Sequence, residues 1–476
     1  MPRLFSASVV LLLATLAPQT RAQVVAPRPA DPVAQPSRFD ERWAAAPSGS
    51  ALWRQLKHLP LAANDRAWIT LGGSLRLRGI ETLGFQFSDA DVMRDGYSEW
   101  RLLASADAWV GRRAGWHARA FAEWRDAQGF GRTLPGGVRS SEADRSDWQD
   151  LFADVGHAQN GLRVGRQDVA LGRERFVGIA DWTNSRRSFD GTRLFAGRGR
   201  YTIDAFDGRV VQVRTNAPNR ADGTSHLRFG QLSYAAAPAV SQSPAGRSRW
   251  AIAGWEAYVF DAESQSGATR RVTTGGRSWA VRRAATTDWT VEAEAAVQRG
   301  ESGARDLRAW FAVGEGSVTW RSRKWSPSIN VGVDAASGTS AADSATRAGT
   351  FAPPYATAHS TNGIADVFGR GNLLERRLGL GARPNAQVQL ALTARRFARV
   401  RTDDGVYSKQ NTLLRGAGGS DSRWIADEVD LTAQWTPRPQ LRLLGGGAWV
   451  GAGDFIRETG TAAPVRWAFA SVTVLF

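Results

Sequence analysis

Arginine is the residue type in this sequence with the clearest capacity for chemistry. Of the 61 cationic residues only three are lysines (Lys57, Lys324 and Lys409), so 58 are arginines. A guanidinium stays charged at every working pH and pairs bidentately with a carboxylate, so a group of arginines can bind anions reversibly. These arginines are spread along the chain and interleaved with Asp and Glu. The pattern indicates either that many arginines share one enclosed, anion-binding surface or simply that the composition is rich in arginine.

Catalytic and metal chemistry finds little support. The chain has no cysteine, which excludes disulfides, cysteine-ligated zinc, iron–sulfur clusters and cysteine nucleophiles. The five histidines show no evident partnering with a serine, as a Ser–His hydrolase would need; they are His58, His117, His157, His226 and His359. We therefore predict no catalytic residue, no metal site, no cofactor and no enzymatic activity.

Length and charge restrict the class of protein. The chain has 476 residues and a formal net charge of +16. Nucleic-acid-binding proteins are also basic, but their Lys and Arg gather in patches or runs, and no run of five like charges occurs here. No stretch of about 20 apolar residues follows the N-terminus, which excludes a helical membrane protein. Soluble domains and β-barrels remain, and we predict no nucleic-acid partner.

The N-terminus carries a targeting signal. A short cationic start precedes the apolar stretch Leu4–Ala17, and Thr20-Arg21-Ala22 offers a small-residue cleavage site. This arrangement predicts a cleaved signal peptide over residues 1–22 that exports the protein to the periplasm, with a buried N-terminal helix as the alternative. Residues 23–66 are expected to form a Pro/Ala-rich leader and a short helical segment, and residues 67–476 the main domain.

From residue 67 onward, hydrophobic residues recur at every second position. In the first such segment Ile69 and Leu71 fall on one face, and Arg76 and Arg78 fall on the other. This alternation predicts β-strands with one apolar face. A soluble sandwich also alternates, but these segments run roughly 10–14 residues, which suits a tilted strand crossing a bilayer better than the usual ~5–6 residues of a globular strand.

The pattern continues to the C-terminus and predicts eighteen strands, an even number as in bacterial barrels. We place them at residues 67–81, 97–110, 116–125, 148–157, 160–168, 190–197, 200–208, 225–235, 249–260, 277–284, 288–299, 307–321, 326–335, 374–383, 386–400, 424–436, 439–451 and 463–476. Short turns alternate with long loops, so we predict an all-β fold, a transmembrane antiparallel β-barrel with short periplasmic turns and long extracellular loops. The segment Ala236–Ser248 breaks the alternation, because it should be short.

Aromatic residues fit a barrel in the bacterial outer membrane. Tryptophans at strand ends, as expected of interfacial girdles, are Trp100, Trp109, Trp116, Trp124, Trp250, Trp289, Trp310, Trp320, Trp435 and Trp449. The last strand ends on Phe476, in phase with Val472 and Val474, which resembles the insertion signal of outer-membrane proteins. We therefore expect membrane lipid, lipopolysaccharide and, through the C-terminal strand, the barrel assembly machinery as partners. The alternative is a chance Phe at the end of a soluble strand.

Three stretches resemble the alginate export family of outer-membrane barrels. They are Gly165-Arg166-Gln167 continuing through Gly172, Arg175 and Asp181-Trp182 to Ser188–Leu194, then Phe351–Tyr355 running into Phe368–Leu373, and Asp427–Leu431 followed by Gly453–Ile456. The resemblance covers roughly residues 38–476. It implies an eighteen-stranded barrel with an arginine-rich pore for an anionic polysaccharide, or a porin of similar build. An exporter would need a long periplasmic gating loop, for which the late turn Thr436–Pro439 is too short.

Alternation also predicts which charged side chains line the pore, because a charged residue facing lipid costs roughly 2–4 kcal/mol. The pore-lining or substrate-binding candidates are Arg76, Arg78, Arg101, Arg119, Glu123, Arg125, Asp154, Arg166, Arg175, Arg186, Arg187, Asp190, Arg193, Glu428 and Asp430, with Asp107, Asp204, Glu292, Glu294 and Arg395 also expected in the lumen. The alternative for the set is a purely structural ladder of Arg–carboxylate pairs. For Arg166 it is a pair with Asp190 across neighbouring strands.

One predicted loop, Val169–Phe189, concentrates arginines. It carries Arg173, Arg175, Arg186 and Arg187. It is expected either to fold inward and narrow the pore or to stay at the outer rim. At the rim its arginines would bind lipopolysaccharide phosphates or only solvate the loop.

Together these patterns predict an outer-membrane channel that passes anionic solutes, with an alginate-like polysaccharide or its oligomers as the solute. The alternative is a general diffusion porin for small anionic or aromatic solutes, without a role in polysaccharide secretion. The histidine distribution disfavours an outer-membrane enzyme. The signal peptide and the terminal Phe476 disfavour a soluble nucleic-acid-binding protein.

Overall fold

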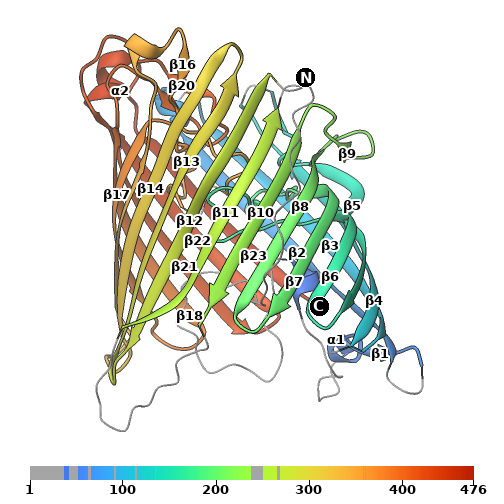
Figure 1. Cartoon of the computed structure of the whole chain (residues 1–476). Coiled ribbons are helices and arrows are strands. Elements are labelled where there is room, and N and C mark those ends of the chain that lie inside the picture. Colours follow the sequence, from blue (N-terminus) through green and yellow to red (C-terminus); the bar gives the residue numbers. More distant parts are fainter. Residues whose placement is uncertain are drawn as a thin grey trace.

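Eighteen long antiparallel strands form one closed β-barrel (Figure 1). The computed structural model describes residues 37–41, 52–62, 66–89, 93–112, 115–134, 136–236, 250–264, 268–357, 359 and 361–476. The predicted signal peptide and the Pro/Ala-rich part of the leader, through residue 36, lie outside these described residues. Every strand predicted from the alternation overlaps one barrel strand, so the predicted fold class is confirmed.

The elements that build the molecule are mostly strands. The barrel strands are β2 (Ala67–Leu83), β3 (Asp95–Gly111), β4 (Trp116–Phe130), β5 (Asp144–His157), β6 (Asn160–Gln167), β7 (Phe189–Arg198), β8 (Tyr201–Gln212), β10 (His226–Ala235), β11 (Ala251–Ser264), β12 (Thr269–Arg283), β13 (Thr287–Ser302), β14 (Arg305–Trp320), β15 (Ser328–Ala336), β17 (Leu373–Ala382), β18 (Val388–Arg399), β21 (Trp424–Arg438), β22 (Leu441–Ala452) and β23 (Val465–Leu475). Short strands are β1 (Leu59–Pro60), β9 (Arg220–Ala221), β16 (Arg347–Ala348), β19 (Val406–Tyr407) and β20 (Leu413–Arg415), and the helices are α1 (Leu52–Gln55) and α2 (Asp454–Thr459). No helix among the described residues is long and apolar enough to cross a membrane.

The seam of the barrel joins its first and last strands. Ser74 of β2 pairs with Leu475 of β23, and the register runs continuously to Leu83 opposite Arg466. In the hydrocarbon core of a membrane every backbone N–H and C=O must find a partner within the protein, and a closed sheet leaves no unpaired edge. Closure at this seam therefore makes a membrane-spanning wall possible.

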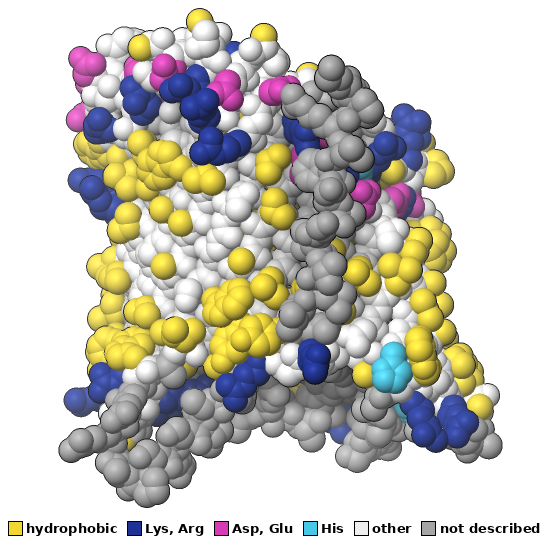
Figure 2. Space-filling view, in the orientation of Figure 1, with side chains coloured by type: hydrophobic (Ala, Val, Ile, Leu, Met, Phe, Trp, Pro, Cys, Tyr) yellow, Lys and Arg dark blue, Asp and Glu magenta, His cyan; other side chains and the backbone are white. Residues whose placement is uncertain are grey.

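The two faces of the wall differ in polarity, as the alternation predicts. On β2, Leu77 is 51% exposed, whereas Arg76 and Arg78 on either side of it are 7% and 5% exposed and point into the barrel. Figure 2 shows hydrophobic side chains over the outer wall, with Lys and Arg gathered above and below them. An apolar band between charged belts is the surface that lipid covers.

The connections differ between the two ends of the barrel. At one end, here called the short-turn end, most are brief, such as residues 158–159 between β5 and β6. At the other, the long-loop end, they include residues 168–188, 337–372 and 400–423. The exception predicted at Ala236–Ser248 lies at the short-turn end between β10 and β11, and most of it is outside the described residues.

Tryptophans mark both ends of the outer wall. Those exposed at the short-turn end are Trp116, Trp250, Trp289, Trp325 and Trp435, and those at the long-loop end are Trp148, Trp310 and Trp449. The prediction that Trp109 joins this girdle is wrong. Its ring stacks on Trp68 at 5.7 Å between centroids and lies 4.8 Å from the Arg119 guanidinium, inside the barrel. The reason is register, since Trp109 shares the inward side of β3 with Arg101 and Asp107.

Among the described residues, the helical segment predicted in the leader takes the form of two short, separate helical pieces. Arg38–Asp40 forms a single 3₁₀ turn, and α1 has only four residues. β1 then adds to the start of β2, with Leu59 opposite Ile69. The leader is thereby attached to the barrel at the short-turn end.

Deleting Phe476 is expected to lower the amount of folded barrel in the membrane. The Phe476 N–H donates to the Gly73 carbonyl at 3.0 Å, and its own carbonyl accepts from the Gly73 N–H at 2.8 Å. The deletion therefore removes the last rung of the seam. The measurement is the fraction of heat-modifiable protein in the membrane fraction. Phe476→Tyr is the control, because it keeps both the rung and an aromatic terminus; equal folded fractions for deletion and wild type would contradict the prediction.

Candidate functional site

Charged side chains on the inward faces of the wall pair with one another. Arg119 on β4 donates two hydrogen bonds to Asp107, at 2.7 and 2.9 Å, and Arg163 on β6 donates two to Asp154 at the same distances. Bidentate charged pairs are among the stronger hydrogen-bonded contacts in proteins. The predicted strand residues on inward positions are Arg76, Arg78, Arg101, Asp107, Arg119, Glu123, Arg125, Asp154, Arg193, Asp204, Glu292, Glu294, Arg395, Glu428 and Asp430. Whether they handle a solute stays a prediction.

Arg166 and Asp190 are the exceptions, and their predicted place in the pore is wrong. Arg166 lies on the same side of β6 as Leu162 and Val164, which are 41% and 53% exposed on the outer wall. Its guanidinium donates to Asp190 of β7 at 2.8 Å and to the Asn219 carbonyl at 3.1 Å. The cross-strand pair that the sequence analysis left open therefore forms, near the long-loop end of the outer face.

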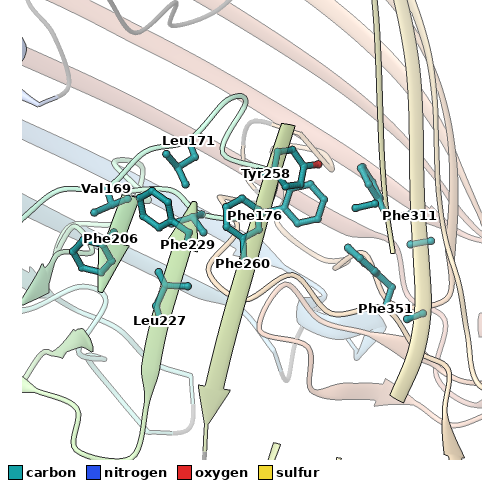
Figure 3. Packing of buried hydrophobic residues seen from close by; sticks show 14 of the residues in the cluster. Val169, Leu171, Phe176, Phe206, Leu227, Phe229, Tyr258, Phe260, Phe311 and Phe351 are labelled. Atoms are coloured by element: carbon teal, nitrogen blue, oxygen red, sulfur yellow. The ribbon is translucent and has the colours of Figure 1, made fainter. Parts of the chain in front are cut away.

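The 168–188 loop, between β6 and β7, leaves the wall and folds into the barrel. Its Phe176 is 3% exposed and contacts Phe260, Phe311 and Phe351, with ring centroids 5.8, 5.4 and 5.9 Å away (Figure 3). Burying a Phe side chain contributes about 1.5–3 kcal/mol. Of the two predicted positions, the loop takes the inward one, and the outer-rim alternative is wrong for its buried arginines.

Arg175 ties this loop to three glutamates on β13 and β14. Its guanidinium donates to Glu292 at 2.9 Å, to Glu294 at 2.6 Å and to Glu315 at 3.0 Å. Arg173 adds a hydrogen bond to Glu292 at 3.0 Å. Carboxylates gathered on adjacent inward positions repel one another, so the loop cations stabilise the wall as well as the loop.

Asp181 ties the same loop to the opposite side of the barrel. Arg101 Nη2 donates to the Asp181 carboxylate at 2.8 Å, and Arg76 Nη1 donates to its backbone carbonyl at 2.8 Å. Burial alone would raise the pKa of Asp181, but the charges of Arg101 and Arg76 outweigh burial and hold this pKa at about 2. β2 and β3 lie across the barrel from β13 and β14 in the strand order. The loop thus spans the interior, offering a cation to one side and an anion to the other.

Trp182 lies in a stack at the β2 side of the loop. The Arg78 guanidinium is 4.0 Å from its ring centre, and the His359 ring is stacked on it at 3.8 Å with an interplanar angle of 10°. Phe469 of β23 contacts it edge-on, at 4.8 Å between centroids. Cation–π contacts between desolvated groups are favourable by about 2 kcal/mol. Trp182 therefore contacts both Arg78 of the wall and His359 of a second loop, residues 337–372.

That second loop, residues 337–372, also folds inward and joins the first. The Tyr355 N–H donates to the Phe176 carbonyl at 2.8 Å. The Thr357 N–H donates to the Glu174 carbonyl at 2.9 Å, and its hydroxyl donates to the Glu174 carboxylate at 2.7 Å. We call these two joined loops the crossbridge. The crossbridge narrows the space inside the barrel from both loops at once.

A buried network lies at the base of the 168–188 loop. Arg186 is fully buried, pairs with Asp168 and lies 3.4 Å from Glu123. Arg125 pairs with Asp144 and is 1% exposed. Buried arginines held in this way are structural ions, because leaving a buried charge unpaired is costly. The structural-ladder alternative is favoured for Arg125 and Arg186.

The remaining candidates also brace the interior. Arg187 donates to the Gly178 carbonyl at 2.7 Å, within the crossbridge. Glu428 on β21 accepts from the Ala365 N–H at 3.3 Å, and Asp430 pairs with Arg395. The Glu428 contact joins the 337–372 loop to the wall, the Arg187 contact lies within the 168–188 loop, and the Asp430–Arg395 pair joins two neighbouring wall strands.

Sequence reasoning missed several residues that the fold brings into the site. Asp181 and Trp182 entered only as motif residues, His359 entered only as a histidine without an evident serine partner, and Glu315 was not considered. The alternation could have found Glu315, since it occupies an inward position of β14 between two glycines. No periodic signal points to His359, because its stacking partner Trp182 belongs to a different loop.

Comparison with known sequences places the chain in a family. The family model described as alginate export matches residues 67–469. This chain belongs to the alginate export family. The resemblance drawn from the motifs is thereby confirmed. No curated sequence matches the chain.

Solved structures with this fold are outer-membrane proteins. OpdK from Pseudomonas aeruginosa, solved with vanillate, is 9% identical with a TM-score of 0.55, covering 85% of this chain and 98% of that one. OccK9 (OpdG) from the same organism is 11% identical with a TM-score of 0.61, covering 86% and 98%. OccAB4 from Acinetobacter baumannii is 9% identical with a TM-score of 0.54, covering 85% and 98%. At these identities the likeness shows the fold alone. Family and fold are those of porin-type outer-membrane channels rather than of enzymes.

Replacing Arg175 by Gln is expected to release the 168–188 loop from β13 and β14. The substitution leaves three glutamates without their shared cation, and breaking a buried ion pair costs about 3–5 kcal/mol. We expect a higher, noisier single-channel conductance while the barrel itself remains heat-modifiable. Arg308→Gln is the control, because the Arg308–Asp306 pair is exposed on the outer wall. A quiet, unchanged conductance for Arg175→Gln would refute the role of this contact.

The Asp181 contact is expected to persist into strong acid. The pKa of Asp181 in the folded state is about 2, below the ~3.9 of a free Asp. The contribution of this contact to stability is therefore fully present at pH values above the pKa of a free Asp. It is lost as the pH falls through about 2. The difference in conductance between wild type and Asp181→Asn should therefore persist from pH 7 to about pH 4 and disappear only near pH 2 to 3. A difference between the two proteins that disappears near pH 4 would contradict the pairing with Arg101.

Proposed function

We propose that this protein conducts small carboxylated solutes, including short oligouronates, across the outer membrane. The observation that carries the proposal is the cluster of Arg76, Arg78 and Arg101 on the inward faces of β2 and β3. These three cations share the carboxylates of Glu99 and Asp181, so the cluster keeps a net positive charge. Arginine suits this role, since its planar fork matches carboxylate geometry.

The cluster also contains buried hydrogen-bond donors that no described residue accepts from. The Nε atoms of Arg76, Arg78 and Arg101 and the Nη1 atom of Arg78 are buried and have no hydrogen-bond partner among the described residues. Buried donors are normally satisfied by protein, water or a bound group. A carboxylate could accept from them, and the nearby acidic groups would keep its binding weak enough for release, as conduction requires.

The crossbridge supports a small solute. It spans the barrel from β2 and β3 to β13 and β14, so any solute must pass beside it. A compact acid or a short oligomer can do so while the loop contacts remain in place. OpdK, a barrel of the same fold, has been solved with vanillate, which makes an aromatic carboxylate a natural test solute.

A complete anionic polysaccharide is the second candidate. Membership of the alginate export family favours it. The arginine cluster would serve a linear polyuronate by the same carboxylate chemistry. A polymer would occupy the lumen along its whole length, however, so this candidate places a stronger demand on the crossbridge.

The surroundings of the barrel follow from its class. Membrane lipid covers the outer wall. We further propose that lipopolysaccharide meets the outer wall at the long-loop end and that the barrel assembly machinery recognises the C-terminal strand ending in Phe476. The terminal rung between Phe476 and Gly73 supports the second point, because it completes the seam.

Ion selectivity tests the proposal directly. Purified protein in a planar bilayer, under a salt gradient, should give a reversal potential that shows anion preference. Replacing Arg76 and Arg78 together by Ala should shift this potential toward cations, because two of the three clustered positive charges are lost. The control is Arg396→Ala, whose exposed pair with Asp427 lies on the outer wall. An unchanged reversal potential in the double variant would remove these arginines from the conduction path.

Solute length separates the two candidates. Vanillate, a uronate monomer and oligouronates of increasing length should be added to the same bilayers. Under the proposal the monomer and short oligomers compete with chloride and cross, whereas long oligomers leave the current unchanged. Long oligomers that block the current and emerge on the far side would favour the polysaccharide.

A further inference from the structure

Ser37–Glu41, which precede the first barrel strand, lie inside the barrel. Phe39 is 6% exposed, and its ring contacts Phe121 of β4 and Phe152 of β5, with centroids 5.6 and 5.2 Å away. Those two residues occupy inward positions on neighbouring strands, opposite each other in the register. A leader residue thus completes an aromatic cluster on the inner wall.

Two lumen arginines hold this segment as well. Arg119 Nη2 donates to the Phe39 carbonyl at 2.6 Å, and the Arg163 guanidinium lies 4.5 Å from the centre of the Phe39 ring. Both arginines also pair with wall carboxylates. Arg119 uses a further N–H group, and Arg163 the face of its guanidinium, to contact Phe39. The segment therefore occupies the ion-paired wall where a passing solute would meet it.

The first two residues of the segment contact the 168–188 loop and the end of the last barrel strand. The Ser37 hydroxyl donates to Asp168, the first residue of the 168–188 loop, at 2.8 Å. Arg38 Nη2 donates to the carbonyl of the C-terminal residue Phe476 at 3.2 Å, and Lys57 Nζ donates to the same oxygen at 3.0 Å. The segment thus lies between the crossbridge and the short-turn end.

Its charge matches this position. One cation, Arg38, is offset by Glu41 at 2.7 Å, and Asp40 adds a second carboxylate. Asp40 is exposed. Its carboxylate interacts electrostatically with Arg119 and Arg193 of the lumen wall. The segment therefore presents a carboxylate to lumen arginines, as an anionic solute would.

We propose that Ser37–Glu41 is a removable plug that closes the short-turn side of the lumen beneath the crossbridge. The proposal rests on the channel function proposed above. It explains why a leader segment carries its only large apolar side chain into the barrel. Among the described residues none of the five is paired with a strand, so withdrawal breaks side-chain contacts and leaves the barrel sheet intact. Anionic solute and plug compete for the same wall.

A reversible lock tests the plug. Because the chain has no cysteine, Ser37→Cys combined with Asp168→Cys provides a single pair of thiols at a direct contact. Single-channel conductance of this double variant should fall severalfold on oxidation and recover when dithiothreitol is added. The two single-cysteine variants are the controls, since they share each substitution and cannot form the disulfide. Equal conductance of the oxidised and reduced double variant would overturn the proposal.

A second variant covers the case in which the cysteine pair disturbs the Asp168 network. Phe39→Ala removes the aromatic anchor and should raise the open fraction of the channel severalfold. Leu61→Ala, at a side chain that is 61% exposed, is the matched leader control and should behave as wild type. Heat-modifiable mobility confirms folding of each variant. An open fraction for Phe39→Ala equal to that of wild type would also count against the plug.

The reversal potential measured in the same bilayers separates the two proposals. Anion preference with no effect of lock or Phe39→Ala overturns the plug and leaves the channel function standing. Gating by the lock without anion preference supports the plug and overturns the proposed solute class. Loss of conductance in every folded variant, including Phe39→Ala, overturns both.

Discussion

Pairing of buried charge inside a closed wall is the interaction on which the rest of this structure depends. Lipid outside the barrel excludes charged side chains, so the alternation sends arginines and carboxylates inward. Once inside they need partners, because an unpaired buried charge is costly. Wall pairs such as Arg119–Asp107 meet this need locally. Where the wall leaves an excess, as at Glu292 and Glu294, a loop arginine supplies the partner.

The same pairing accounts for the crossbridge. A loop that carried only one sign of charge could attach to one side of the barrel. The 168–188 loop carries Arg175 toward the glutamates of β13 and β14 and Asp181 toward the arginines of β2 and β3. Aromatic packing around Phe176 and Trp182 then adds apolar burial to these polar contacts. The crossbridge therefore narrows the interior of the barrel. It separates the glutamates of β13 and β14 from the arginines of β2 and β3.

Charge balance also separates arginines that are paired within the wall from those proposed to meet a solute. Arg125 and Arg186 are buried and pair with Asp144 and Asp168, and Arg166 faces outward in a pair of its own. Arg76 and Arg78 lie instead in a group with more cations than anions. A high arginine content is therefore not in itself a measure of anion affinity. Barrels of this fold keep the wall at about a tenth sequence identity.

The sequence by itself determined the wall: eighteen strands, their inward charges and their closing Phe476, because period-two alternation is local and each strand reports its own two faces. The same rule, applied consistently, would also have placed Arg166 on the outward face with Leu162. It would have placed Trp109 on the inward face of its strand. Only the tertiary structure decided the contacts of Arg175, the stack of Trp182 on His359 and the position of Phe39 inside the barrel. These contacts join loop or leader residues to strands far away in the chain, where no periodicity exists to record them. They form because a closed barrel brings distant inward faces together around loops that must bury and pair what they carry.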